Sequence, residues 1–411
     1  MDKKVSPFIV FRYPDYAYMW WGIFISQIGA EMMIIALNWQ VYLLTKSPLS
    51  LGLIGAARFI PMLACSLLAG LVADIVNRKK LIFVVQIILI SVAFTLAALT
   101  FTHTIQPFMI YILVAIYASA HAFGMPARQS IVPHLVPREH FMRAVSLNSL
   151  IWQAASIIGP SIGGFIIGFW GVGFIYVYAM ISFFAVNIAM FLIKQIPKNE
   201  HLTEFSLKSI KTGISFVRHT PLIWSTMLLD FFATFFASSM TLMPIFAKDI
   251  LNVGPQGLGI LYAAPALGSV IFGLLFSSLH KVYNQGKVLL TSIIIYGIST
   301  ALFGASKIFF LSLVCLFVAG ASDSVSSIIR NTVRQLTTPD HLRGRMTSIN
   351  MIFYMGGPQL GEVEAGIAAT LVGTPWSVVF GGVGTIVAAL LMAKLVPSLV
   401  RYNHHEDVAQ T

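Results

Sequence analysis

Apolar runs about as long as a bilayer-crossing helix recur along the whole chain. Twelve runs can be marked, at approximately 17–45, 49–74, 81–101, 108–127, 144–169, 174–194, 222–247, 257–280, 287–306, 309–330, 346–371 and 377–398. A helix needs roughly 20 residues to cross the hydrocarbon core. Backbone that faces lipid must satisfy its own hydrogen bonds, as helices and closed barrels do. Because the runs are too long and too continuous for barrel strands, the sequence predicts an all-α integral membrane protein with twelve transmembrane helices.

Charged residues are scarce and unevenly placed. They make up 10% of the 411 residues, against about 25% in soluble domains. The net charge is +11, and lysine and arginine concentrate at 77–80, 126–143, 194–218 and 328–345. These stretches fall on every second connection, as the positive-inside rule expects of cytoplasmic loops. Their placement indicates contact with membrane lipid and not with nucleic acid. It predicts a multi-pass protein of a bacterial-type plasma (inner) membrane with both termini in the cytoplasm.

The sequence shows no sign of a cleaved leader or of a metal site. Residues 1–21 lack a small-residue cleavage site behind a short apolar core, so we expect a cytoplasmic tail that leads into the first run. Cys65 and Cys315 are the only cysteines, and each lies within an apolar run. We expect both to be packing residues, with no disulfide framework, no metal and no bound cofactor.

The two halves of the chain repeat each other. Residues 127–148 align with 329–350, which places Arg128 opposite Arg330 at a separation of 202 residues. Internal repeats are a feature of secondary transporters, whose sites lie where the repeats meet. A polar and basic segment divides the runs six and six. The predicted domains are a first six-helix bundle at 1–194, a linker at 195–218, a second six-helix bundle at 219–398 and a cytoplasmic tail at 399–411.

A glycine and proline pattern occurs in the fifth run and again in the eleventh. "GPSIGG" at 159–164 pairs with "GPQLGE" at 357–362. Small residues let helix backbones approach closely, and proline removes one backbone hydrogen bond and bends a helix. We therefore expect bent and closely packed helices at six positions, Gly159, Pro160, Gly163, Gly357, Pro358 and Gly361.

The stretch "GLVADIVNRKK" at 70–80 resembles the loop signature of the major facilitator superfamily. It matches that signature at four positions, Gly70, Asp74, Arg78 and Lys79. It departs where Ile75 replaces a basic residue and Asn77 replaces glycine. The resemblance implies two pseudo-symmetric six-helix bundles in which runs 1, 4, 7 and 10 line a cavity. It also implies a cytoplasmic latch, in which Asp74 pairs towards Arg345 near the start of the eleventh run.

Further stretches resemble one branch of that superfamily. They are "AARFIP" at 56–61, "PARQ" and "VPRE" within 126–139, and "GGPQLGEVEAG" at 356–366. The branch contains enterobactin-type siderophore exporters and macrolide efflux proteins among the drug:proton antiporters. Its members carry different cargo, so the resemblance does not supply the substrate.

Several ionisable residues fall well inside the predicted runs. The acids are Glu31, Asp230, Asp323, Glu362 and Glu364, and Arg58 is the one basic residue placed deep in a run. A charge at the bilayer centre costs about 2.5–3.5 kcal/mol on insertion scales, so each should face protein or water. The five acids are candidates for proton coupling, together with His121, which the repeat places opposite Asp323. A structural ion pair is the alternative for the acids. A hydrogen-bonded helix contact is a further alternative for Glu362 and Glu364, and a hydrogen-bonded packing role is the alternative for His121.

Arg58 has two alternative partners. Its depth and that of Glu31 allow a pair within the first half, which would be structural. In the superfamily the second run faces the eleventh across the two bundles. A pair of Arg58 with Glu362 or Glu364 would therefore act as a gate that breaks and reforms. Glu362 and Glu364 point about 200° from one another on a helix, so they do not form a side-by-side acid pair.

The resemblance also suggests residues for a substrate cavity. It places Asn38 and Gln40, in the same run as Glu31, near the cavity lining. Asp230 is flanked by phenylalanines at 231, 232, 235 and 236. These rings either line a site for a large aromatic cargo or face lipid.

The combined features predict a monomeric secondary active transporter that uses a proton gradient to export an amphipathic small molecule by alternating access. A siderophore or a hydrophobic drug is the expected cargo. An importer of the same fold is one alternative, because the motifs do not determine the direction of transport. A membrane-embedded enzyme or lipid-handling protein is another. Against an enzyme, the sequence has no nucleophile motif, nucleotide-binding loop or metal-ligand spacing.

Overall fold

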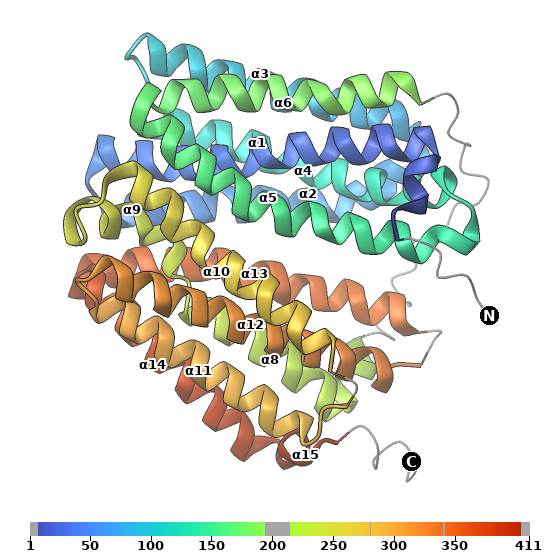
Figure 1. Cartoon of the computed structure of the whole chain (residues 1–411), viewed down its shortest axis with the longest axis vertical. Helices are drawn as coiled ribbons and strands as arrows, with labels where there is room; N and C mark the ends of the chain where they lie inside the picture. The colour runs from blue at the N-terminus through green and yellow to red at the C-terminus, as the bar shows by residue number, and fades with distance from the viewer. Residues whose placement is uncertain (1–6, 194–213, 280, 340–341, 404–411) are drawn as a thin grey trace. The chain divides into compact units, whose positions relative to one another are not determined.

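The computed structural model describes residues 7–193, 214–279, 281–339 and 342–403, which are almost entirely helical (Figure 1). No β-strand occurs within these residues. Eleven of the helices that they form are long and apolar enough to cross a membrane. The predicted all-α membrane fold is therefore confirmed.

The twelfth predicted run, 346–371, corresponds to helix α13, Arg343–Val372. This helix has 30 residues, so at 1.5 Å per residue it is about 45 Å long and can reach across a bilayer. It is not apolar enough to be counted with the other eleven, because it carries four charged residues and several glycines. Charges retained inside a spanning helix indicate a function more often than a packing need.

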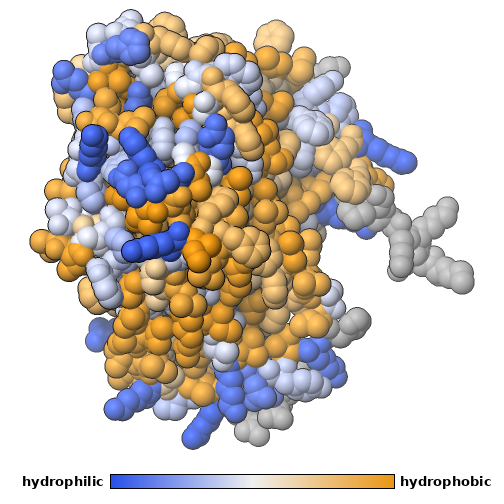
Figure 2. Space-filling model, turned by 60° about the vertical axis from the view of Figure 1, so that its left-hand side comes forward, coloured by the Kyte–Doolittle hydropathy of each residue, from blue (hydrophilic) through white to orange (hydrophobic). Residues whose placement is uncertain are grey.

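Hydrophobic side chains cover much of the face shown in Figure 2. Phe191, Phe310 and Leu371 are 85%, 75% and 78% exposed. Monomeric soluble proteins rarely expose large contiguous apolar patches. This surface is therefore suited to lipid.

Contacts group the helices into two compact units, and each is described by itself. Unit 1 contains the described residues 7–45, 57–193 and 255–259. Its elements are η1 Pro7–Arg12, α1 Pro14–Thr45, the larger part of α2 Pro48–Ile75, α3 Arg78–Phe101, α4 Pro107–Leu135, η2 Arg138–His140, α5 Phe141–Trp170 and α6 Val172–Leu192. Helix α1 packs against α5 and α6, and α3 packs against α4 and α6 (Figure 1).

Buried aromatic side chains hold the helices of unit 1 together. Tyr16, Tyr176 and Phe183 are each at most 1% exposed. The Tyr16 hydroxyl donates to the carbonyl of Ala144 at 3.0 Å, which ties α1 to α5. A buried tyrosine normally finds such a partner for its polar tip while the ring fills the core.

Unit 2 contains the first turns of α2, within 46–56, and most of the second half of the chain. Its other elements are α8 Pro221–Phe236, η3 Ser239–Leu242, α9 Met243–Ile245, η4 Phe246–Ile250, α10 Gly254–Ser277, α11 Gln285–Ala305, α12 Phe309–Thr337, α13, α14 Thr374–Leu395 and α15 Pro397–Arg401. Residues 255–259 of α10 belong to unit 1. Helix α11 packs against α12 and α14, and α8 packs against α13 and α14.

The predicted run at 222–247 is not one continuous α-helix. Helix α8 ends at Phe236, and a 3-10 turn and a short π-helix follow it. At this break, Ser238 Oγ donates to the carbonyl of Pro358 in α13 at 3.0 Å, and the Tyr262 hydroxyl donates to the carbonyl of Met240 at 2.8 Å. Irregular backbone at membrane depth is tolerated where neighbouring protein satisfies its polar groups.

The predicted linker at 195–218 lies outside the described residues up to 213. The predicted tail at 399–411 is described as far as Asn403. The predicted domain boundaries therefore stay a prediction.

Candidate functional site

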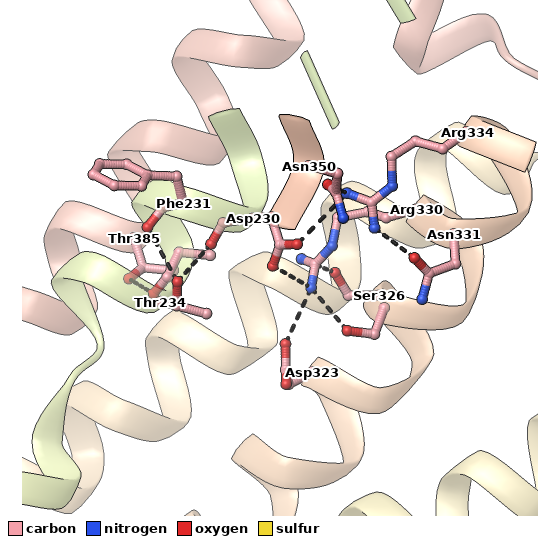
Figure 3. Close-up of polar contacts among 12 residues, drawn as sticks. Asp230, Phe231, Thr234, Asp323, Ser326, Arg330, Asn331, Arg334, Asn350 and Thr385 are labelled. Carbon is pink, nitrogen blue, oxygen red and sulfur yellow. Dashed lines mark hydrogen bonds and ion pairs between the residues drawn. The ribbon is translucent and has the colours of Figure 1, made fainter. Parts of the chain in front are cut away.

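A network of buried charges joins three helices of unit 2 (Figure 3). We call it the Arg330 network. Its members are Asp230 of α8, Asp323, Arg330 and Arg334 of α12, and Asn350 of α13. Arg330 Nη2 lies 3.0 Å from Asp230 Oδ1 and 3.3 Å from Asp323 Oδ1. Arg334 Nη1 lies 3.6 Å from Asp230 Oδ2. Asp230 therefore binds two guanidinium groups, and Arg330 binds two carboxylates.

The spacing of the charged residues along α12 explains why they meet. Arg330 follows Asp323 by seven residues, and Arg334 follows Arg330 by four. These spacings put all three side chains on one face of an α-helix. Helix α12 packs against α8, so that face meets Asp230 on the neighbouring helix.

Neutral groups complete the hydrogen bonding of the two arginines. Arg330 donates to Ser326 Oγ at 2.6 Å and to Ser327 Oγ at 3.0 Å. Arg334 Nη1 donates to Asn350 Oδ1 at 2.5 Å, which connects α12 to α13. Buried charges are tolerated when they are paired and hydrogen-bonded. Two acids and two bases balance here, so the network carries no net charge when all four are ionised.

Access to solvent differs sharply within the Arg330 network. The side chains of Arg330 and Asp230 are 1% and 4% exposed, whereas that of Asp323 is 40% exposed. Asp323 is therefore the exposed end of the network, and the other three charged side chains are buried.

Glu31 is held within unit 1. Gln27 Nε2 donates to Glu31 Oε1 at 3.0 Å on the same helix. Arg58 of α2 lies close enough for its charge to act on the Glu31 carboxylate. Gly159 of α5 makes room for this acid, because a Cβ added at Gly159 would lie 2.6 Å from the Cβ of Glu31. Pairing of Arg58 with Glu31, or with the acids of α13, stays a prediction.

Helix α4 carries the first-half counterpart of the charged face of α12. The repeat puts His121 in the place of Asp323 and Arg128 in the place of Arg330. The rings of His121 and Tyr117 are stacked, with centroids 6.0 Å apart and 19° between their planes. The charge of Arg128 acts on both rings. Three ionisable side chains therefore share this face.

Glu362 lies against the first turns of α2, which belong to unit 2. A Cβ added at Gly55 would lie 2.7 Å from the Cβ of Glu362, and one added at Gly52 would lie 2.8 Å from the Glu362 carbonyl oxygen. Only glycines on α2 allow this approach. Glu364 is half-buried on another face of the same helix.

Asn38 and Gln40 are both buried in unit 1, at 4% and 6% exposure. Gln40 Nε2 donates to Thr100 Oγ1 at 3.0 Å, and the Tyr176 hydroxyl donates to Gln40 Oε1 at 2.7 Å. Both ends of the Gln40 amide are thus used between α1, α3 and α6. The predicted cavity role of these two residues stays a prediction.

Gly357 and Gly361 let α13 approach α8 at backbone distance. A Cβ added at Gly357 would overlap Thr234 Oγ1, and one added at Gly361 would overlap the carbonyl oxygen of Phe235. Pro358 lies between them, inside the helix.

The matching residues of α5 also make close contacts. Gly163 faces Met32 of α1, since a Cβ added there would lie 3.4 Å from Met32 Cγ. The carbonyl oxygen of Pro160 lies against Gly259 of α10. A Cβ added at Gly259 would be only 2.6 Å from that oxygen. The pattern therefore serves helix contacts in both units.

Residues of the loop signature organise the start of α3. Asn77 Oδ1 accepts a hydrogen bond from the backbone N–H of Lys79 at 3.0 Å and caps the helix. Arg78 Nη1 donates to the carbonyl of Ser130 in α4 at 3.2 Å, and Lys79 Nζ donates to the carbonyl of Ile193 at 2.8 Å. The surroundings of Gly70 and of the Asp74 side chain lie outside the described residues. A latch between Asp74 and Arg345 therefore stays a prediction.

Arg330 and Arg334 are site residues that were not predicted from the sequence. Both lie in the basic stretch at 328–345, which the positive-inside rule assigns to a loop, and Arg58 is predicted to be the one deep base. That assignment is wrong, because α12 runs to Thr337 and buries both arginines. A usable signal was the spacing of seven residues between Asp323 and Arg330, which puts opposite charges on one helical face.

The described residues show no arrangement typical of a metal site. Among them, no group of three or more histidine, cysteine, aspartate or glutamate side chains is placed to hold a metal ion. Cys65 and Cys315 are free thiols.

Sequence relatives cover almost the whole chain. The enterobactin exporter EntS of Escherichia coli O1:K1 / APEC is 26% identical over 399 residues, which are 95% of this chain and 94% of that protein. The enterobactin exporter EntS of Citrobacter koseri is 25% identical over 404 residues, which are 96% of this chain and 95% of that protein.

Solved structures of transporters share the fold. A bacterial homolog of the human lysosomal transporter Spinster, in an inward-facing and unoccupied conformation, superimposes with a TM-score of 0.76 at 13% identity over 95% of this chain and 98% of that chain. The nucleoside transporter NupG gives a TM-score of 0.72 at 15% identity over 94% and 99%. These relatives are transporters and not enzymes, which sets aside the enzyme alternative. A sequence model of the family described as "Transmembrane secretion effector" matches residues 5–408, so the chain belongs to that family and is a transporter of the major facilitator superfamily.

Proposed function

We propose that this transporter exports an amphipathic small molecule by proton-coupled alternating access, with a siderophore as the first candidate cargo. The likeness to enterobactin exporters over 95% of the chain supports both the direction and the cargo class. Repeated halves suit alternating access, in which the substrate site opens to one side and then to the other. The basic loops support a bacterial inner membrane with both termini in the cytoplasm.

The shared guanidinium of Arg330 is the observation that carries the coupling proposal. Asp323 and Asp230 compete for this group, and only Asp323 is open to solvent. A proton that binds Asp323 removes one of the two anions and leaves Arg330 to Asp230 alone. Release of the proton restores the competition. The interaction energy between α12 and α8 therefore differs between the two protonation states. A difference of this kind shifts a conformational equilibrium.

Secretion from cells tests the direction and the cargo. A bacterial strain that makes enterobactin but lacks its own exporter is supplied with this chain, and enterobactin is measured in the medium. We expect the wild-type chain to restore secretion. A parallel panel of dyes and macrolides measures drug accumulation in the same strain. Unchanged secretion together with unchanged accumulation of every drug would overturn the export proposal.

Proton flux in proteoliposomes tests the coupling. The substrate identified in cells is added, and an internal pH-sensitive dye reports proton movement. We expect Asp323→Asn to uncouple transport, and we test Glu31→Gln and Glu362→Gln as the other coupling candidates. Glu139→Gln changes an exposed acid of η2 and is the matched control. Normal proton coupling in all three variants would exclude these acids as the proton carriers.

A further inference from the structure

Arg128 is the first-half counterpart of Arg330, but it lacks a carboxylate partner. Arg330 is bound by Asp230 and Asp323. Where unit 2 has Asp323, unit 1 has His121. Within the described part of the chain, no ion pair involves Arg128, and its Nε is buried without a hydrogen-bond partner. Two carboxylates therefore balance the charge of Arg330 in unit 2, whereas no carboxylate among the described residues balances the charge of Arg128 in unit 1.

The other charges around α4 do not supply the missing anion. Glu31 accepts a hydrogen bond from Gln27 and has Arg58 as its cationic neighbour. The group that acts electrostatically on Arg128 is Tyr117, which is neutral at physiological pH. Arg128 is thus without a paired carboxylate among the described residues of unit 1. An unpaired charge inside a helical bundle is unfavourable, so this position favours an incoming anion.

Aromatic rings lie beside Arg128 on the same helical face. Tyr117, His121 and Arg128 are spaced by four and seven residues, which keeps them on one side of α4. The Tyr117 ring stacks on His121 and also contacts the Phe183 ring of α6, with centroids 6.3 Å apart. All three residues of α4 are only partly buried, so a ligand can reach them. A flat ring can stack here while its acidic group meets the guanidinium.

We propose that Arg128, with the rings of Tyr117 and His121, forms an anion-binding subsite that takes the acidic group of an aromatic cargo. The subsite deepens the proposed export function and rests on it, because it states what the transporter selects. A guanidinium binds a carboxylate through two parallel hydrogen bonds, which gives both strength and orientation. Arg330 offers no equivalent subsite, since two carboxylates already occupy it.

Binding of a matched acid and ester tests the subsite without any transport step. The probes are 4-hydroxybenzoate and its uncharged methyl ester, offered by equilibrium dialysis to the full-length protein in phosphatidylcholine nanodiscs. The wild type should prefer the acid by about tenfold or more, the size of one charge-assisted hydrogen bond. Arg128→Gln should abolish the preference, and Arg128→Lys should keep part of it. Arg138→Gln, which removes a charge from the exposed turn η2, should leave it unchanged.

His121→Asp is the second variant, and it keeps Arg128 in place. It introduces the acid that unit 2 has at this position, so Arg128 gains an internal partner. We expect this variant to fold and to bind acid and ester equally. A wild type without acid preference, or a preference that survives in either folded variant, overturns the subsite. Failure of the export proposal is recognised separately, because the cell assay then shows no secretion while acid binding is intact.

Discussion

Arg330 and Asp230 form an ion pair between two helices that almost completely excludes solvent. Arg330 Nη2 lies 3.0 Å from Asp230 Oδ1, and the two side chains are 1% and 4% exposed. Each charge can be buried because the other one pairs with it. Loss of either partner alone would leave the other charge buried and unpaired, which is strongly destabilising.

Removal of one partner should destabilise unit 2 strongly. Asp230→Asn or Arg330→Gln leaves an uncompensated buried charge, so we expect a loss of about 3–5 kcal/mol in the free energy of unfolding. The double variant Asp230→Asn/Arg330→Gln should lose less than the sum of the two single variants. Thermal unfolding of the purified protein measures all three. Arg401→Gln, at an exposed position of α15, is the control and should change little. Additive losses would show that the pair does not act as a unit.

Asp323→Asn should separate stability from coupling. Its carboxylate is 40% exposed, so water replaces much of what the substitution removes, and we expect a loss of roughly 1 kcal/mol or less. Substrate-driven proton flux, by contrast, should fall to the level of protein-free liposomes. The two measurements are made on the same preparation. A stability loss as large as that of Asp230→Asn would show that Asp323 is structural and not the open end of the network.

Composition and the length of the apolar runs were enough to predict the fold. Eleven of the twelve predicted runs coincide with helical segments of spanning length and hydropathy, one of which is the interrupted segment Pro221–Ile250, and the twelfth is α13. Hydropathy describes how a whole segment partitions between water and the bilayer. It therefore does not depend on which side chains each residue packs against. The break after Phe236 was missed for the same reason. The hydropathy of a whole run does not show a turn whose Ser238 side chain bonds to the carbonyl of Pro358 on another helix.

The candidate site was predictable only in part. Intramembrane acids are rare enough to stand out, which is how Asp230 and Asp323 were found. Arg330 and Arg334 were missed, because arginine near a helix end is also what the positive-inside rule predicts. Whether such a residue points to water or to a buried acid depends on the rotation of α12 against α8, which is a tertiary property. The partner of Arg58 depends on helix rotation as well, so the sequence allows Glu31 and the acids of α13 alike.

Gly55→Ala should disturb the contact between α2 and α13. The added Cβ would lie 2.7 Å from the Cβ of Glu362 and 2.8 Å from the carbonyl oxygen of Gln359. Backbone cannot move aside as a flexible side chain can, so we expect overpacking to cost about 1–3 kcal/mol of stability. Transport should fall with it. Gly344→Ala is the matched control, because no atom lies within 4 Å of the added Cβ. A variant as stable as the wild type would mean that α2 and α13 do not pack as described.

Tyr176→Phe should reveal whether Gln40 belongs to the packing of unit 1 or to the cargo site. The variant removes the hydroxyl that donates to Gln40 Oε1 at 2.7 Å, and it leaves a buried acceptor unpaired. We expect a loss of about 1–3 kcal/mol in the free energy of unfolding. Gln40→Leu should cause a similar loss, and the double variant should lose little more, because the partners disappear together. The order of preference among transported cargoes should not change in any of the three. A changed preference with unchanged thermal stability would place Gln40 in the cargo site, as the sequence resemblance implies.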